Sequence, residues 1–100
     1  MTTYNKLVRD KIPEFLDSKG ISYEARIADQ EEYKVELIKK LGEEIGEFLE
    51  AKNSEELADV MEVIDALKKL PEFTDVEIVK NKKFKDRGGF EKRIICKGEK

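Results

Sequence analysis

Residues 36–70 constrain the fold most, because two amphipathic helical patterns follow one another with only a tight turn at residues 52–54 between them. Each pattern carries two acids three positions apart. They are Glu44 with Glu47 and Glu56 with Asp59. Side chains at positions i and i+3 lie side by side on a helix. On two antiparallel helices these pairs would gather four carboxylates around one point, and such a group needs a cation to offset its repulsion.

The first of these helices is expected to begin at a cap formed by Asp29 and to end near Lys52. Its apolar positions recur at helical spacing: Leu37, Ile38, Leu41, Ile45, Phe48 and Leu49. A solvent-exposed acidic face, braced by pairs such as Lys40 with Glu44, is the alternative to a metal site. That alternative is weaker near the helix end, where like charges repel and oppose the helix dipole.

The second helix is expected over residues 54–70, with a buried arc formed by Leu57, Val60, Met61, Val63, Ile64 and Leu67. On a helical projection Glu56 lies inside this arc and Asp59 lies at its edge, although carboxylates are rarely buried without a partner. Asn53 and Glu56 have the spacing of a capping box, which is an alternative role for Glu56. No cap explains Asp59. We therefore favour a metal site.

The residue types that are missing narrow the chemistry. The sequence has no histidine and one cysteine, Cys96. Histidine-based catalysis, most zinc sites and an internal disulfide are therefore excluded. A metal in this chain must be held by oxygen ligands, which favours Mg²⁺, Mn²⁺ or Ca²⁺.

The remaining elements complete a mainly α fold in a single domain spanning residues 1–100. We expect a short helix from Pro13 to a stop at Gly20, and a fourth helix opened by a Thr74–Glu77 capping box and ending near Asp86. Alternating patterns predict short strands at 21–27 and 90–96. The expected architecture is a helical bundle of about four helices with a small peripheral β-ribbon.

Charge is distributed unevenly along the chain. Residues 30–70 hold twelve acidic and six basic side chains, whereas residues 71–100 hold nine basic and six acidic ones. An acidic centre between basic ends suits a metal with an anionic substrate across it, and a solvated surface is the alternative. The Arg87-Gly88-Gly89 turn either lets amides approach a phosphate or simply ends the fourth helix. A nucleic-acid interface is disfavoured because the net charge is −3.

No apolar run approaches the ~20 residues that span a bilayer, and the first residues carry no apolar leader region. We therefore expect a cytoplasmic protein that does not bind a membrane.

Four motifs resemble the MazG-like, all-α nucleoside triphosphate pyrophosphohydrolases, in the small branch labelled phosphoribosyl-ATP pyrophosphohydrolase-like. They read Y-N-K-L-V-R-D-K-I-P at 4–13, L-G-E-E-I-G-E-F at 41–48, E-E-L-A-D-V at 55–60 and R-G-G-F at 87–90. The resemblance implies that Glu44, Glu47, Glu56 and Asp59 bind Mg²⁺, with Mn²⁺ as a substitute. It also implies a homodimer or higher homo-oligomer with sites near the interface.

The expected reaction is hydrolysis between the α and β phosphates of a nucleoside triphosphate, which gives the monophosphate and pyrophosphate, as in house-cleaning enzymes. Glu44 or Glu47, with Glu43 behind them, is the expected base. The basic residues expected to bind the triphosphate are Lys6, Arg9, Lys11, Lys83, Arg87 and Lys92.

Two alternatives to this reaction are kept. The first is hydrolysis of phosphoribosyl-ATP itself, which is less favoured because the sequence lacks the Tyr-His pair that those enzymes tend to carry after the motif aspartate. The second is a non-catalytic helical interaction module, which predicts no stabilisation by Mg²⁺.

Overall fold

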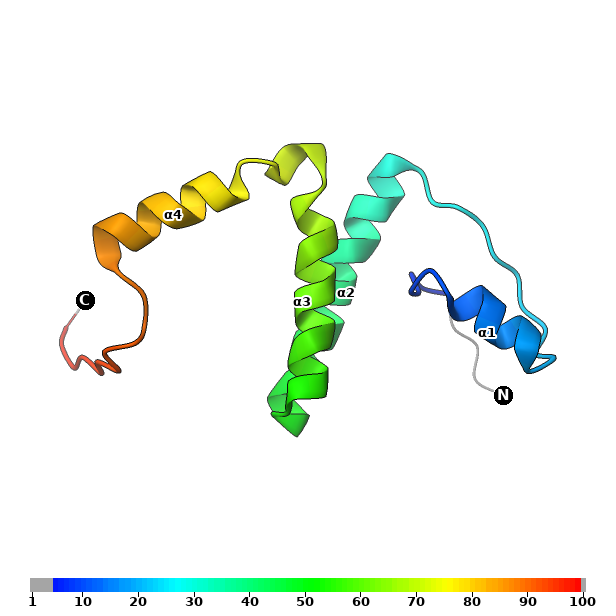
Figure 1. The fold of residues 1–100 in the computed structure, drawn as a ribbon, viewed down its shortest axis with the longest axis horizontal. Coiled ribbons are helices and arrows are strands. Elements are labelled where there is room, and N and C mark those ends of the chain that lie inside the picture. Colours follow the sequence, from blue (N-terminus) through cyan, green and yellow to red (C-terminus); the bar gives the residue numbers. More distant parts are fainter. Residues whose placement is uncertain (1–4, 100) are drawn as a thin grey trace.

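The computed structural model describes residues 5–99, which form four α-helices and one short 3-10 turn (Figure 1). The elements are α1 (Ile12–Ser18), α2 (Gln30–Ala51), α3 (Ser54–Lys68), the 3-10 turn (Pro71–Phe73) and α4 (Val76–Arg87). The predicted mainly α fold class is confirmed.

An antiparallel hairpin of α2 and α3 forms the centre of the molecule (Figure 1). Helix α2 begins as predicted, because the Asp29 carboxylate accepts a hydrogen bond from the Glu32 amide at 2.9 Å. The helix ends at Ala51, and the left-handed backbone of the next residue, Lys52 (φ 52°), turns the chain. The Asn53 side chain then caps α3 by accepting from the Glu56 amide at 2.9 Å. This two-residue connection forces the two helices to be neighbours.

The hydrophobic core is small and lies along the hairpin. Leu37, Val63 and Leu70 are buried at its centre. The partly buried side chains packed around them are Leu7, Tyr33, Leu41, Ala66, Leu67 and Phe73. Leu7 is the only one of these that comes from the segment before α1, so this contact holds the N-terminal segment against the hairpin.

Helix α1 is short, as predicted, and Pro13 lies in its first turn. The helix ends at Ser18, and the chain reverses at Gly20, where the amides of Gly20 and Ile21 donate to the carbonyls of Asp17 and Leu16. The positive φ of Gly20 (67°) suits this reversal of the chain. None of the α1 residues is buried, so the helix lies outside the core.

The predicted β-ribbon is wrong for the described residues, which contain no strand. Residues 21–27 follow α1, whereas residues 90–96 follow α4 on the opposite side of the hairpin (Figure 1). The two segments are therefore too far apart to pair. The alternation of apolar residues does not lead to strands because Ile27 and Ile95, for example, are almost fully exposed and have no sheet partner.

The predicted start of the fourth helix also needs correction. Thr74 has helical backbone angles, and its hydroxyl donates to the Pro71 carbonyl at 3.4 Å instead of capping α4. The cause is the 3-10 turn that Pro71 initiates, which places Thr74 at the end of one turn. Helix α4 then begins at Val76 after Asp75, without a side-chain cap.

The described chain is extended. Its radius of gyration is 18.0 Å, against about 13 Å for a compact domain of 100 residues. Helices α1 and α4 project to opposite sides of the hairpin and make few contacts with it (Figure 1). Many large apolar side chains are consequently exposed, among them Leu49, Met61, Ile78 and Phe84. None of the helices within residues 5–99 has the length and apolar character needed to cross a bilayer.

Candidate metal centre

Three of the four predicted metal ligands come together in the hairpin. Glu44, Glu56 and Asp59 each offer a carboxylate oxygen, and these oxygens lie within 4.8 Å of one another. Glu44 comes from α2, and Glu56 and Asp59 come from the first two turns of α3. We call these three residues the acidic cluster.

The turn between the helices brings these residues together. Glu44 lies eight residues before Lys52, and Asp59 lies six residues after Asn53. In an antiparallel hairpin, residues at similar distances from the turn lie at similar heights. The spacing of three between Glu56 and Asp59 then directs both toward α2. The spacing in the sequence therefore predicted this part of the site.

Burial makes Glu44 the most informative member of the acidic cluster. Its exposed fraction is 8%, and it is the only buried charged residue within residues 5–99. Its Oε2 atom is buried and has no hydrogen-bond partner, and the same holds for Oε2 of Glu56. Its Oε1 atom lies 3.5 Å from the ammonium of Lys40. Buried carboxylate oxygens without a partner are costly unless a ligand satisfies them.

The pKa of Glu44 is raised above the ordinary glutamate value. Burial is the main cause, and the charge of Glu47 adds to it. Lys40 opposes the shift, and Asp59 reinforces it. In contrast, the pKa of Glu43 is lowered, because its carboxylate accepts a hydrogen bond from Lys6. The two neighbouring glutamates are therefore in different environments. The Glu43 carboxylate is paired with Lys6, whereas the Oε2 atom of Glu44 has no hydrogen-bond partner.

The cap on α3 explains the role of the Glu56 backbone but not that of its side chain. Its amide donates to the Asn53 side chain, as the capping alternative predicted. Its carboxylate, however, belongs to the acidic cluster and holds one of the two orphaned oxygens. The backbone of Glu56 serves the cap, and its side chain faces the other acids.

Glu47 lies one turn beyond Glu44 on α2 and is exposed. Its carboxylate is not in the acidic cluster, but it is near enough for its charge to raise the pKa of Glu44. The role of Glu47 as a metal ligand stays a prediction.

Two of the predicted phosphate-binding residues lie beside the acidic cluster. Arg9 Nη2 donates to Asp59 Oδ1 at 2.7 Å, and Lys6 Nζ donates to Glu43 Oε1 at 3.0 Å. Both belong to the segment before α1. Lys11, on the same segment, is exposed and forms no ion pair within residues 5–99. The structure thus brings basic and acidic motifs together although they are far apart in sequence.

The other three predicted phosphate-binding residues, Lys83, Arg87 and Lys92, belong to α4 and the segment after it. Helix α4 projects away from the hairpin on the side opposite α1 (Figure 1). The Gly88 amide donates to the Phe84 carbonyl at 2.7 Å and ends α4. The helix-ending role of the Arg87-Gly88-Gly89 turn is therefore observed, and this amide is already used.

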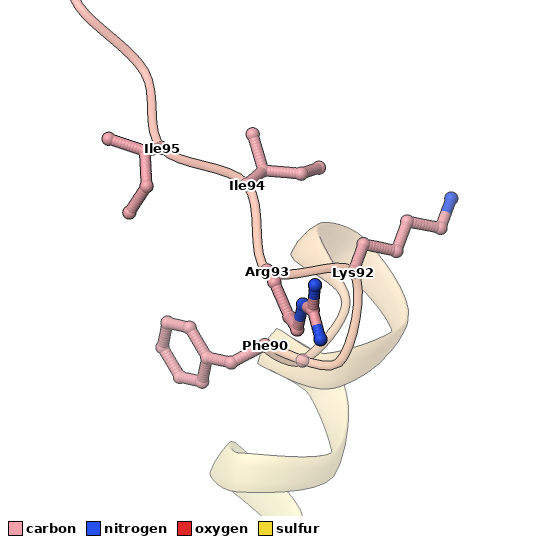
Figure 2. A pocket seen from close by; sticks show the side chains of 6 residues that line it. Phe90, Lys92, Arg93, Ile94 and Ile95 are labelled. Carbon is pink, nitrogen blue, oxygen red and sulfur yellow. The ribbon is translucent and has the colours of Figure 1, made fainter.

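An open cavity of about 330 Å³ lies along residues 89–95 (Figure 2), and none of the residues of the acidic cluster lines it. Its lining contains Phe90, Ile94 and Ile95 together with Lys92 and Arg93, and no carboxylate. Figure 2 shows the Lys92 side chain directed away from the ring of Phe90. We therefore place the candidate site at the acidic cluster.

Sequence reasoning missed Glu62. Its Oε1 atom lies 3.9 Å from Arg9 Nη1, so Arg9 faces two acids of α3. The signal was present in the spacing of three between Asp59 and Glu62, which puts both on one face of the helix.

No family model, curated protein or solved structure matches this chain. The MazG-like resemblance therefore rests on the four motifs alone. Independently of that resemblance, the acidic cluster fits a hard divalent cation, because all of its donors are carboxylate oxygens, and Glu44 and Glu56 each have a buried oxygen without a partner.

Proposed function

We propose that this protein is a Mg²⁺-dependent nucleoside triphosphate pyrophosphohydrolase of the MazG-like kind, which releases pyrophosphate and a nucleoside monophosphate. The proposal names Mg²⁺ or Mn²⁺ as the cofactor and a nucleotide as the partner. One observation carries it: the buried Glu44 carboxylate has an orphaned oxygen and faces Glu56 and Asp59 from the other helix.

The acidic residues of the site would have different roles in this reaction. Glu44, Glu56 and Asp59 would hold the metal through their clustered oxygens. A bound Mg²⁺ would neutralise phosphate oxygens and lower the pKa of a water molecule. Glu47 is exposed beside Glu44 and would orient that water and accept its proton, and no histidine competes for this role. Glu43 is held by Lys6 and would support the segment that carries Arg9.

The test is pyrophosphate release from a panel of canonical and modified nucleoside triphosphates, with Mg²⁺ or with EDTA. We expect release that requires the metal and yields the monophosphate. The melting temperature is measured in parallel, with and without Mg²⁺. Stabilisation by Mg²⁺ without turnover of any nucleotide would support the metal site and refute the tested substrates. The absence of both effects would refute the proposal.

The shape of the subunit supports the homo-oligomer that the resemblance implies. Each hairpin helix keeps an exposed apolar stripe: Ile38, Ile45 and Leu49 on α2, and Leu57, Met61 and Ile64 on α3. Gly42 and Gly46 lie on the α2 stripe, and nothing lies within 4 Å of where their Cβ atoms would be. Another helix can therefore approach α2 closely. We propose that a second copy of the chain covers these stripes.

Met61→Glu tests this assembly. A charge buried at the centre of an apolar interface has no partner, so we expect subunit affinity to fall at least about tenfold. The measurement is the mass by light scattering across a dilution series. Ile78→Glu is the matched control, because it places the same charge at an exposed apolar position on α4. A monomeric wild-type protein would refute the assembly, and dissociation by Ile78→Glu alone would move the interface to α4.

The exposed apolar stripes also favour the second function, a non-catalytic interaction module. That function gives the Glu44 carboxylate no cation, so it predicts that Mg²⁺ leaves the melting temperature unchanged. The melting experiment described above separates the two functions.

A further inference from the structure

The acidic cluster already has a cation beside it, and this cation comes from the protein. The Arg9 guanidinium reaches Asp59 at 2.7 Å from a position 50 residues away in the sequence. Asp59 is one of the three clustered carboxylates, and the oxygen that Arg9 contacts is Oδ1. Arg9 therefore neutralises a residue that the proposed metal also needs.

The ion pair between Arg9 and Asp59 can break without detaching the segment that carries Arg9. The Arg9 side chain is 57% exposed, and exposed ion pairs contribute little to stability. The segment that carries Arg9 is attached to the hairpin by the partly buried Leu7 and by the Lys6–Glu43 pair, neither of which involves the acidic cluster. Arg9 can therefore leave Asp59 while its segment stays attached.

A carboxylate that binds a divalent cation is a poorer acceptor for a guanidinium, and two cations held by one carboxylate repel each other. A guanidinium displaced from Asp59 would lie close to the phosphates of a nucleotide bound at the acidic cluster. Its planar fork of N–H donors matches two oxygens of a phosphate as well as it matches a carboxylate.

We propose that Arg9 is an exchangeable counter-ion of the metal centre, which leaves Asp59 when a divalent cation binds and then holds a phosphate of the nucleotide. This inference rests on the proposed function. It makes the metal and the nucleotide bind with positive coupling: the ion pair opposes binding of the metal alone, and the released Arg9 assists binding of both together.

The first test is calorimetric titration of Mg²⁺ alone into the wild-type protein, Arg9→Gln and Lys80→Gln. Arg9→Gln removes the cation that competes for Asp59, so we expect it to bind Mg²⁺ about two- to fivefold more tightly than the wild type. Lys80→Gln removes the same charge from an exposed position on α4, away from the acidic cluster, and we expect near wild-type affinity.

The second test repeats the titration with a nucleoside triphosphate whose α–β bridging oxygen is replaced by methylene. Here we expect Arg9→Gln to bind the nucleotide with Mg²⁺ more weakly than the wild type, because the phosphate loses its guanidinium. An independent readout is the NMR signal of the Arg9 Nε–H group, assigned by its loss in Arg9→Gln. We expect this signal to shift when Mg²⁺ is added to the wild-type protein.

The outcomes separate the exchange from the proposed function. If the wild type binds Mg²⁺ and Arg9→Gln binds it equally or more weakly, the exchange is refuted and the metal centre stands. The same follows if the Arg9 signal stays unchanged at saturating Mg²⁺. If none of the proteins binds Mg²⁺, the proposed function fails and the exchange fails with it. Binding by Arg9→Gln alone supports both.

Discussion

Asp59→Asn should lower Mg²⁺-dependent pyrophosphate release at least about 100-fold while leaving the helical fold intact. The amide keeps the size of the side chain but removes the charge that completes the acidic cluster with Glu44 and Glu56. Asp59 is half-exposed and packs in no core cluster, so the loss should not come from unfolding. The measurement is steady-state turnover, with circular dichroism of the same sample.

Asp65→Asn is the matched control for this variant. It makes the same chemical change on the same helix, at an exposed position outside the acidic cluster. We expect its turnover to match that of the wild-type protein. Full turnover by Asp59→Asn would mean that the clustered carboxylates do not hold the metal used in catalysis.

Glu44→Gln should stabilise the protein in the absence of divalent metal. The wild-type carboxylate is buried, its Oε2 atom is unpartnered, and its charge is repelled by Glu47. The neutral amide removes this repulsion, and Lys40 keeps its other partner, Glu43, at 3.4 Å. We expect the free energy of unfolding to rise by about 1–2 kcal/mol, equivalent to several degrees in melting temperature.

Magnesium should reverse this order of stability. A ligand that binds only the folded state adds about 2.7 kcal/mol at 100 times its dissociation constant, and Glu44→Gln lacks a ligand needed for that binding. Glu50→Gln, an exposed change on the same helix, should follow the wild type under both conditions. Equal stability of Glu44→Gln and wild type without metal would show that Glu44 carries no uncompensated charge.

The stabilisation by Glu44→Gln should depend on pH. The pKa of Glu44 is higher in the folded state than in the unfolded chain, so between the two values the folded state binds more protons. Raising the pH through this window therefore lowers the stability of the wild type. The advantage of the Gln variant should be largest above the folded pKa and should vanish below the unfolded one, which urea titrations at a series of pH values measure.

The hairpin was predictable because local chemistry determines it. Asp29 and Asn53 each accept the bond from the amide three residues later, and these caps set the starts of both helices. The spacing of the acids then set which carboxylates meet. Three of the four predicted ligands cluster, and only Glu47, whose side chain is exposed on α2, lies outside the cluster.

The parts that were not predictable depend on tertiary contacts. The alternation at residues 21–27 is real in the sequence, but a strand needs a partner, and its expected partner lies beyond the hairpin (Figure 1). Thr74 had the right spacing for a cap, and Pro71 diverted its hydroxyl. The ion pair between Arg9 and Asp59 spans 50 residues, and no local pattern indicates which of several exposed cations forms it.

The connection of Lys52 and Asn53 also determines where this chain can accept an inserted residue. A residue inserted there would change the left-handed and extended backbone conformations of Lys52 and Asn53, and with them the way α3 packs on α2. Such a change would disturb the contact of Asp59 with Glu44 and the packing of Val63 in the core together. The long connection between α1 and α2 can therefore vary in length. The two-residue turn cannot, because the hydrophobic core and the acidic cluster depend on the same register of α3 against α2.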